Sequence, residues 1–342
     1  MILGTEEGQG IAALGSRHKL RTARRTPHSP LAPFSPPDYH PRPDQPKEPT
    51  FSQVSPSPAL PLPQSRYTGV GSLFHHDPAA AAAFVLERFP DFPFWPQLPA
   101  RGESMIEQAL AEPSETSIPG FFELERRLAG TAPAFVKGQV AGPETLRKAG
   151  RGTYDDMAAR VEENAVWQVR RIHALGRTAV ISIDEPSWTE PLGPASRGIA
   201  SRMVAGIRAS GAFVGFHCCG RAPWFDILGF RPDFVNPDVS AGAAPFLAEF
   251  GQAVRGHLSS DGWIGWGLVP TTRPPGQARE IVKDFLAAIK PLGDVKRVLE
   301  RSFVTPACGL GTLTPVQGEE VLRVLYEISR FLRCDHLGLP AR

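Results

Sequence analysis

Cysteine is scarce in this 342-residue chain, and neither sign of charge is in clear excess. Four cysteines in so long a chain do not form the disulfide framework of a small secreted protein. The 37 Lys and Arg against 35 Asp and Glu exclude a strongly basic nucleic-acid-binding protein and an acidic, self-repelling chain. Apolar runs stay well short of the roughly 20 residues that a membrane span requires. We therefore expect a cytoplasmic protein with neither a nucleic-acid nor a membrane partner.

Proline, in contrast, is abundant and unevenly distributed. Residues 1–65 hold 13 of the 36 prolines, among Ser, Arg and His residues without periodicity. Proline fixes φ and removes a backbone donor, so such a stretch builds neither a helix nor a strand ladder. The composition predicts a disordered segment over residues 1–65, and a misassigned translation start explains it equally well. Residues 66–342 are then expected to form one domain.

From Arg66 onward, short β-type runs alternate with longer amphipathic stretches. The eight β-type runs are Tyr67–Leu73, Phe92–Leu98, Ala134–Val140, Thr178–Ile183, Ala212–His217, Phe234–Pro237, Ile264–Val269 and Phe303–Pro306. The expected helices are Asp77–Phe89, Thr153–Leu175, Pro245–Leu258, Gly276–Ile289 and Pro315–Leu332. This alternation predicts an α/β fold of the (β/α)8 TIM-barrel type. A doubly wound sheet is the alternative, but Gly69-Val70-Gly71 lacks the third glycine of a dinucleotide-binding loop.

Potential metal ligands follow several of the predicted strands. In an extended chain residues i and i+2 point to the same side, so His217 and Cys219 face one point and Cys218 faces away. Cys308 and Asp238 follow two other strands, and barrel enzymes carry their chemistry at this end. The N, S, S and O atoms of these residues suit zinc. The alternative is that they are small buried core residues, since free cysteine is often fully buried.

The charge of this ligand set suggests a type of reaction. Two thiolates, a carboxylate and a neutral imidazole make an electron-rich zinc site, whereas hydrolytic zinc sites favour several histidines and a water. Metal coordination deprotonates a thiol, and the thiolate is the nucleophile. The set therefore favours alkylation of a thiol.

Five sequence motifs resemble the catalytic barrel of cobalamin-independent methionine synthase, in the superfamily shared with uroporphyrinogen decarboxylase. In chain order the motifs are Gly69-Val70-Gly71-Ser72-Leu73, Lys137-Gly138-Gln139-Val140-Ala141-Gly142-Pro143-Glu144-Thr145, Ile183-Asp184-Glu185-Pro186-Ser187, His217-x-Cys219 and Cys308-Gly309-Leu310. Their order matches that of the family, and they span the chain from Arg66 nearly to its C-terminus.

The resemblance implies a fold, a metal site and a reaction. It implies zinc ligands at His217, Cys219 and Cys308, and it places Ser72 and Asp184 at the amino-acid end of homocysteine. Asp238 stands where the family has a glutamate ligand, one methylene longer. The implied activity is transfer of a methyl group to homocysteine to give methionine.

The methyl donor is left open by the resemblance. Residues 1–65 are too short to replace the family's N-terminal domain, which helps to hold folate. The short chain is similar to barrels that take a methyl group from methylcobalamin or a corrinoid protein, and methyl-folate is the other candidate donor.

Other interpretations of the same residues remain. A related zinc enzyme acting on another thiol or demethylating a corrinoid fits them, as does a non-catalytic corrinoid- or metal-binding barrel. A decarboxylase is disfavoured because that chemistry has no use for zinc cysteines. We also expect Glu103 to help bind the substrate amine, and Lys137 to form an ion pair with an acidic residue inside the barrel.

Overall fold

The computed structural model describes residues 63–341, and within this range seven parallel strands form one curled sheet. The strand order is β1-β7-β6-β5-β4-β3-β2. The strands are β1 (Arg66–Tyr67), β2 (Val136–Ala141), β3 (Ala179–Asp184), β4 (Phe213–Cys218), β5 (Phe234–Pro237), β6 (Trp263–Val269) and β7 (Ser302–Pro306). Every named pairing is parallel, as the repeated β-then-α pattern predicts.

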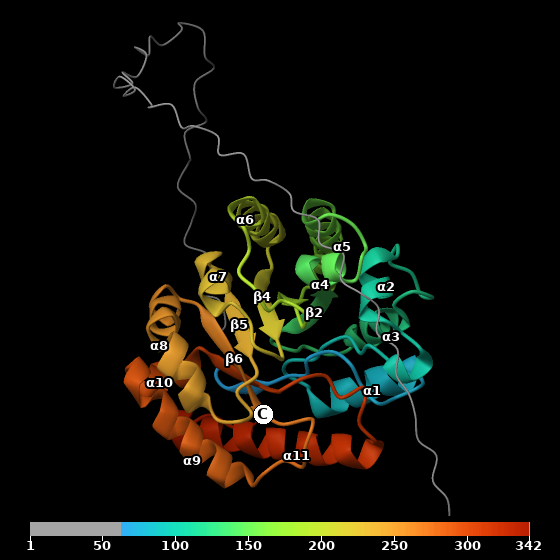
Figure 1. Cartoon of the computed structure of the whole chain (residues 1–342). Coiled ribbons are helices and arrows are strands. Elements are labelled where there is room, and N and C mark those ends of the chain that lie inside the picture. The colour runs from blue at the N-terminus through green and yellow to red at the C-terminus, as the bar shows by residue number, and fades with distance from the viewer. Residues whose placement is uncertain (1–62, 342) are drawn as a thin grey trace, which may run out of the picture. The chain divides into compact units, whose positions relative to one another are not determined.

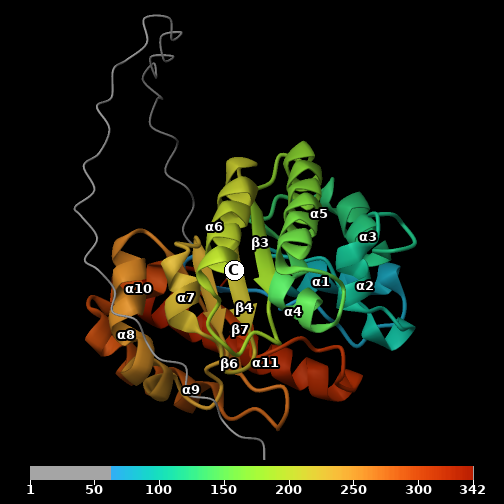
Figure 2. The same cartoon turned by 45° about the horizontal axis from the view of Figure 1, so that its top comes forward.

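Helices connect the strands and cover the sheet (Figure 1). The α-helices are α1 (Pro78–Arg88), α2 (Met105–Leu110), α3 (Pro119–Leu128), α4 (Pro143–Lys148), α5 (Tyr154–Ala174), α6 (Pro194–Ala209), α7 (Trp224–Gly229), α8 (Ala243–Ser259), α9 (Ala278–Ile289), α10 (Val295–Glu300) and α11 (Pro315–Phe331). Three shorter helical turns are η1 (Pro99–Arg101), η2 (Lys290–Leu292) and η3 (Leu332–Leu337). Helix α5 packs beside α6, and α9 lies between α8 and α11 (Figures 1 and 2).

The five helices expected from the sequence are confirmed, and each of their ends agrees with the structure to within two residues. Asp77 caps α1 by accepting hydrogen bonds from the backbone N–H groups of Ala79 and Ala80. Thr314 forms a capping box with Gln317 at the start of α11. Short polar side chains before an apolar periodic run therefore mark these helix starts correctly.

Two of the eight predicted strands are only partly formed. The run 67–73 contributes β1 and an isolated bridge from Ser72 to Gln97, and the run 92–98 contains isolated bridges at Phe94 and Gln97. The second run includes Pro93 and Pro96, which have no N–H to donate, so a continuous ladder cannot form there. Even so, this run bonds on both sides, because Leu73 N–H donates to the Gln97 carbonyl and Trp95 N–H donates to the Lys137 carbonyl.

The enclosed face of the sheet changes character from one end to the other. Near the amino ends of the strands, six apolar side chains pack together: Phe92, Phe135, Val180, Phe234, Trp263 and Phe303. Toward the carboxyl ends the buried side chains become polar, among them Lys137, Gln139, Ser182, His217, Asn236 and Thr305. Buried polar groups require partners, so this end is built from a hydrogen-bonded network.

The prediction for residues 1–65 falls mostly on residues 1–62, which lie outside the described range. Ser65, the last residue of the segment 1–65, is buried, and its N–H donates to the Ser302 carbonyl at 2.6 Å. The folded domain therefore begins before Arg66. Among the described residues, none of the helices is both long and apolar enough to cross a membrane.

Candidate metal centre

Three side chains predicted as zinc ligands meet on the enclosed side of the sheet. One ligand atom from each of His217, Cys219 and Cys308 lies within 4.8 Å of the others. His217 and Cys219 stand at the carboxyl end of β4, and Cys308 follows the end of β7. Strands β4 and β7 are separated by β5 and β6 in the sheet, so its curvature is what brings these side chains together. We call this group the His-Cys-Cys cluster.

The imidazole of His217 is oriented for a ligand. Its Nδ1 lies 3.0 Å from the Asn236 carbonyl oxygen, which can only accept, so the neutral ring carries its proton on Nδ1. The other nitrogen, Nε2, is buried and has no hydrogen-bond partner among residues 63–341. A buried polar atom without a partner requires an explanation, and a metal ion is one that also accounts for the two nearby thiols.

The two cysteines of the cluster differ in their affinity for protons. Contact with the Cys219 thiol, aided by nearby His217, lowers the pKa of Cys308 below its usual value, although burial opposes the shift. The same contact with Cys308, together with burial, raises the pKa of Cys219. The contacts within the cluster therefore favour the thiolate form of Cys308, and thiolate is the form that binds metals.

Cys218 and Asp238 are not part of the cluster. The side chain of Cys218 is 1% exposed and belongs to the main hydrophobic core, as the alternation along β4 predicts. Asp238 follows β5 as expected, but its Oδ1 accepts a hydrogen bond from the Ser240 N–H at 2.8 Å. To bind a metal shared with the cluster, this carboxylate has to move closer to the three ligand atoms, because Asp238 is not among the side chains that lie within 4.8 Å of one another.

Asp184 ends β3 and is buried close to the cluster. Its Oδ1 accepts a hydrogen bond from the Ser182 hydroxyl at 2.6 Å. Burial raises the pKa of Asp184, while electrostatic interactions with Lys137 and His217 oppose this shift. A buried carboxylate at this position can receive a cationic group of a bound molecule.

Lys137 is placed differently from our expectation of a direct ion pair. Its Nζ donates to the Val70 carbonyl at 2.6 Å and lies 3.3 Å from Oε1 of Gln139. Burial lowers the pKa of Lys137 to about 8, and the more distant Asp184 partly offsets this. The ammonium group therefore has two neutral oxygens in contact and a carboxylate only at longer range, so its charge is incompletely compensated inside the protein.

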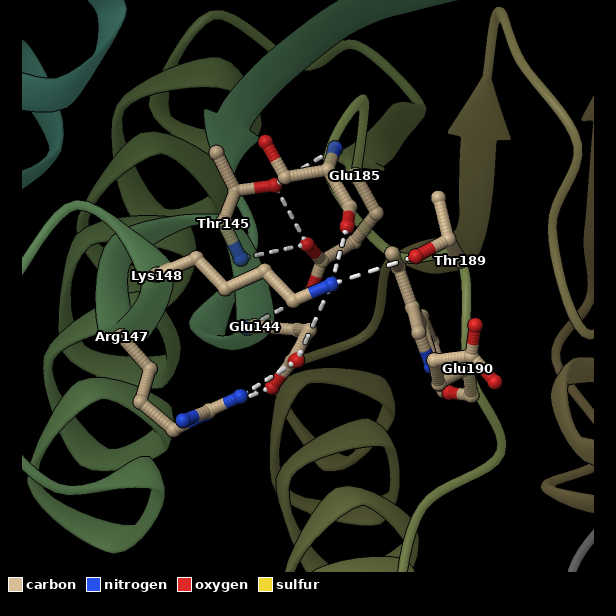
Figure 3. A network of polar contacts seen from close by, with 9 residues as sticks. Glu144, Thr145, Arg147, Lys148, Glu185, Thr189 and Glu190 are labelled. Atoms are coloured by element: carbon tan, nitrogen blue, oxygen red, sulfur yellow. Dashed lines mark hydrogen bonds and ion pairs between the residues drawn. The ribbon is translucent and has the colours of Figure 1, made fainter. Parts of the chain in front are cut away.

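Glu185, beside Asp184, directs its carboxylate to the start of α4 and so anchors the loop after β3 (Figure 3). Its carboxylate accepts hydrogen bonds from the N–H groups of Glu144 and Thr145 at 2.9 and 2.8 Å, and from the Thr145 hydroxyl at 2.6 Å. Burial raises the pKa of Glu185 to about 7. Gly142 makes the approach feasible, because a Cβ there would lie 2.3 Å from Cδ of Glu185. Two of the five motifs are therefore joined by this contact.

The first and last motifs also meet. The Ser72 carbonyl accepts a hydrogen bond from the Leu310 N–H at 2.8 Å, and the Ser72 hydroxyl accepts one from the Gly311 N–H at 3.2 Å. A Cβ at position 309 would lie 2.0 Å from Oγ of Ser72, so only glycine fits there. These contacts hold Ser72 against the loop that carries Cys308.

Glu103 has one carboxylate oxygen held and one without a hydrogen bond. Its Oε2 accepts from the Leu98 N–H and from Nε2 of Gln108, both at 2.8 Å. Its Oε1 is buried without a hydrogen bond and lies 3.5 Å from Nε of Arg101. Burial raises the pKa of Glu103. Oε1 can accept a hydrogen bond from an ammonium group that competes with Arg101 for this carboxylate. Gln108 and its partner Gln97 were not singled out from the sequence.

Asn236 is the other contributor that sequence reasoning missed. Its carbonyl positions His217, while its side chain is 1% exposed and bonds to two other strands. A polar residue inside the predicted run Phe234–Pro237 was the one signal available.

No family model and no curated protein matches this chain. Among solved structures, 3-keto-D-glucoside 4-epimerase from E. coli is 9% identical with a TM-score of 0.45, covering 77% of this chain and 98% of that one. D-psicose 3-epimerase is 12% identical with a TM-score of 0.43, covering 78% and 99%. A β-(1,4)-mannanase from Podospora anserina is 12% identical with a TM-score of 0.37, covering 78% and 61%. Similarities this low carry no argument about the function of the chain.

Proposed function

We propose that this protein is a zinc-dependent methyltransferase that methylates a thiol, with homocysteine as the substrate and methionine as the product. The observation that carries the proposal is the His-Cys-Cys cluster, in which Nε2 of His217 is buried without a hydrogen bond and faces two thiols. Imidazole and thiolate donors suit zinc. Bound zinc would lower the pKa of an incoming thiol and so supply the thiolate nucleophile.

The residues around the cluster have separate roles in this proposal. His217, Cys219 and Cys308 hold the metal, and Asp238 is a further ligand if its carboxylate moves closer to them. Asp184 is a buried acceptor beside the cluster, suited to the substrate ammonium group.

Two further residues bind the amino-acid end of homocysteine. Ser72 is held against the Cys308 loop, where its hydroxyl can still donate to a carboxylate. Glu103 offers Oε1, its oxygen without a hydrogen bond, to the ammonium group. The contacts between motifs described above support the resemblance to methionine synthase barrels.

The reaction is a displacement at a methyl carbon. The substrate thiol loses its proton to solvent, its sulfur forms a bond to the methyl carbon, and the bond between that carbon and the donor breaks. The bonding electrons remain with the donor, as methyl transfer from methylcobalamin, a methylated corrinoid protein or methyl-folate requires. The chain's own task is to orient the sulfur and the amino-acid end.

We also infer that the sheet closes into a (β/α)8 barrel through residues 92–98. This run bonds to Gly71 and Leu73 on one side and to Lys137 on the other, which is the position of a strand between β1 and β2. A barrel closed in this way places the carboxyl ends of its strands around one opening.

Zinc content and methyl transfer test the proposal together. Full-length protein purified under reducing conditions should hold one zinc per chain and form methionine from homocysteine with methylcobalamin or methyl-folate. Cys308→Ser protein is the negative control, and coenzyme M in place of homocysteine tests a different thiol. Wild-type protein with far less than one zinc per chain, or with zinc but no methyl transfer from either donor to homocysteine, would overturn the proposal.

A further inference from the structure

The contact between His217 and Asn236 joins two directly paired residues of neighbouring strands. His217 on β4 and Asn236 on β5 are register partners, and the His217 ring turns back to the Asn236 carbonyl at 3.0 Å. The orientation of the imidazole therefore depends on where this one peptide unit of β5 lies.

That peptide unit lies where β5 is no longer paired with β6. Strand β5 pairs with β6 only at Phe234 and Val235, and the next bridge between these segments is at Asp238. Asn236 lies in the gap between these two positions and is not paired with a residue of β6. The peptide unit of Asn236 is thus paired with β4 but not with β6, and a small displacement of its carbonyl would rotate the ring that bonds to it.

The side chain of Asn236 fills this gap. Its Nδ2 donates to the Gly265 carbonyl on β6 at 2.8 Å and to the Thr305 hydroxyl on β7 at 3.0 Å. A Cβ at position 265 would lie 2.9 Å from this nitrogen, so Gly265 provides the space that the amide occupies. The amide replaces the missing ladder bonds and ties β5 to both following strands.

We infer that Asn236 is a positioning residue for the metal centre, which holds the His217 imidazole with its proton on Nδ1 and with Nε2 toward Cys219 and Cys308. The inference rests on the metal centre of the proposed function and is independent of the reaction catalysed there. Hydrogen bonds to the second nitrogen of a ligating histidine fix its tautomer and its orientation.

Zinc affinity of three variants tests the inference. Asn236→Leu removes both amide bonds, and Thr305→Val removes only one. Asn164→Leu is the matched control, because Asn164 is another buried amide, bonded to Gln108 and Gln168 on a helix. We expect Asn236→Leu to weaken zinc binding by roughly 10- to 100-fold, as outer-shell changes generally do. Thr305→Val should weaken zinc binding less than Asn236→Leu does. The zinc affinity of Asn164→Leu should stay within about twofold of that of wild type, because Asn164 bonds to Gln108 and Gln168 and not to a residue of the cluster.

The measurement is competition with a chelator on full-length protein, with folding checked by circular dichroism. Among the three variants, Asn236→Leu should change the absorption spectrum of the cobalt-substituted protein most. In this variant the ¹⁵N resonances of the His217 imidazole should show that the proton no longer prefers Nδ1. If Asn236→Leu fails to fold, the comparison of Thr305→Val with Asn164→Leu decides the question.

Two results would overturn the inference: folded Asn236→Leu protein with wild-type zinc affinity, or an equal loss in Asn164→Leu. Wild-type protein that binds zinc tightly but transfers no methyl group would overturn the proposed function and leave this inference in place.

Discussion

Cys218 and Cys219 are adjacent in the chain, yet only Cys219 lies with His217 and Cys308, while Cys218 is buried in the main hydrophobic core. The separation follows from the alternation of side chains along β4. It means that two chemically identical neighbours differ completely in their expected effect on metal binding.

We therefore expect Cys219→Ser and Cys308→Ser to lose zinc and Cys218→Ser to retain it. A serine hydroxyl is a much poorer zinc ligand than a thiolate. The zinc affinity of the first two variants should therefore fall by more than the roughly 10- to 100-fold that is typical when a residue bonded to a ligand is replaced. Metal analysis of the reduced, dialysed proteins measures this. Equal zinc loss in Cys218→Ser and Cys219→Ser would contradict the assignment of the ligand.

The contact between Gly142 and Glu185 predicts a stability effect. In Gly142→Ala, a Cβ 2.3 Å from the Glu185 carboxyl would force this buried group away from the start of α4. Overpacking of this kind destabilises by about 1–3 kcal/mol. Urea denaturation monitored by circular dichroism measures the free energy of unfolding.

Gly193→Ala is a matched control for this substitution. Both glycines cap a helix that begins with proline and have similar φ and ψ angles, but a Cβ at 193 would meet no atom within 4 Å. The difference between the two variants isolates the clash with Glu185, and equal destabilisation would show that the clash is relieved without cost.

Lys137 predicts a dependence of stability on pH. Burial lowers its pKa in the folded protein to about 8, from an ordinary value of 10.5. Between these values the unfolded chain binds more protons than the folded one, so the free energy of unfolding rises with pH in this window. The full gain attributable to this group is about 3 kcal/mol, the size that a shift of this magnitude implies.

Comparison with Lys137→Met separates this contribution from that of other titrating groups. The difference in unfolding free energy between wild type and variant, measured by urea denaturation from pH 7 to 10.5, should move in favour of wild type as the pH rises. A difference that stays constant over this range would show that the Lys137 ammonium is not destabilised by burial.

Glu103 predicts selectivity for an amine on the substrate. In the proposed function Oε1, which pairs with Arg101 in the protein alone, bonds to the homocysteine ammonium, so Glu103→Gln removes a charge-assisted hydrogen bond. Such bonds contribute about 1.5–3 kcal/mol, which corresponds to a rise of roughly 10- to 100-fold in KM. The KM for 4-mercaptobutyrate, which lacks the amine, should stay unchanged. An equal effect on both thiols would place the amine elsewhere.

The sequence predicts the three side chains of the His-Cys-Cys cluster better than the residues that support them. His217, Cys219 and Cys308 are found from the spacing of ligand types at strand ends, because strand alternation directly determines the facing of residues i and i+2. The position of Asn236 depends on a gap in the ladder between β5 and β6, which has no local signature. The partly formed strand 92–98 has a local cause, since its prolines interrupt the pairing that its apolar residues favour.

Glu185 shows a third kind of limit. Its neighbour Asp184 and the Gly142-Pro143 motif are both recognisable in the sequence. The contacts of Glu185 with Glu144 and Thr145, however, join positions 41 and 40 residues apart. Such a contact depends on how closely β2 and β3 pair, and the pairing register is a tertiary property.

The aromatic layer at the amino ends of the strands has a kinetic consequence. Phe92, Phe234, Trp263 and Phe303 are all at most 3% exposed, so this end of the enclosed space is filled. In the proposed function, a thiol and a bulky methyl donor that both react at the His-Cys-Cys cluster then have to arrive from the same side. The smaller molecule has to be in place before the larger one covers it, and the donor in excess should slow turnover by blocking the route of the thiol.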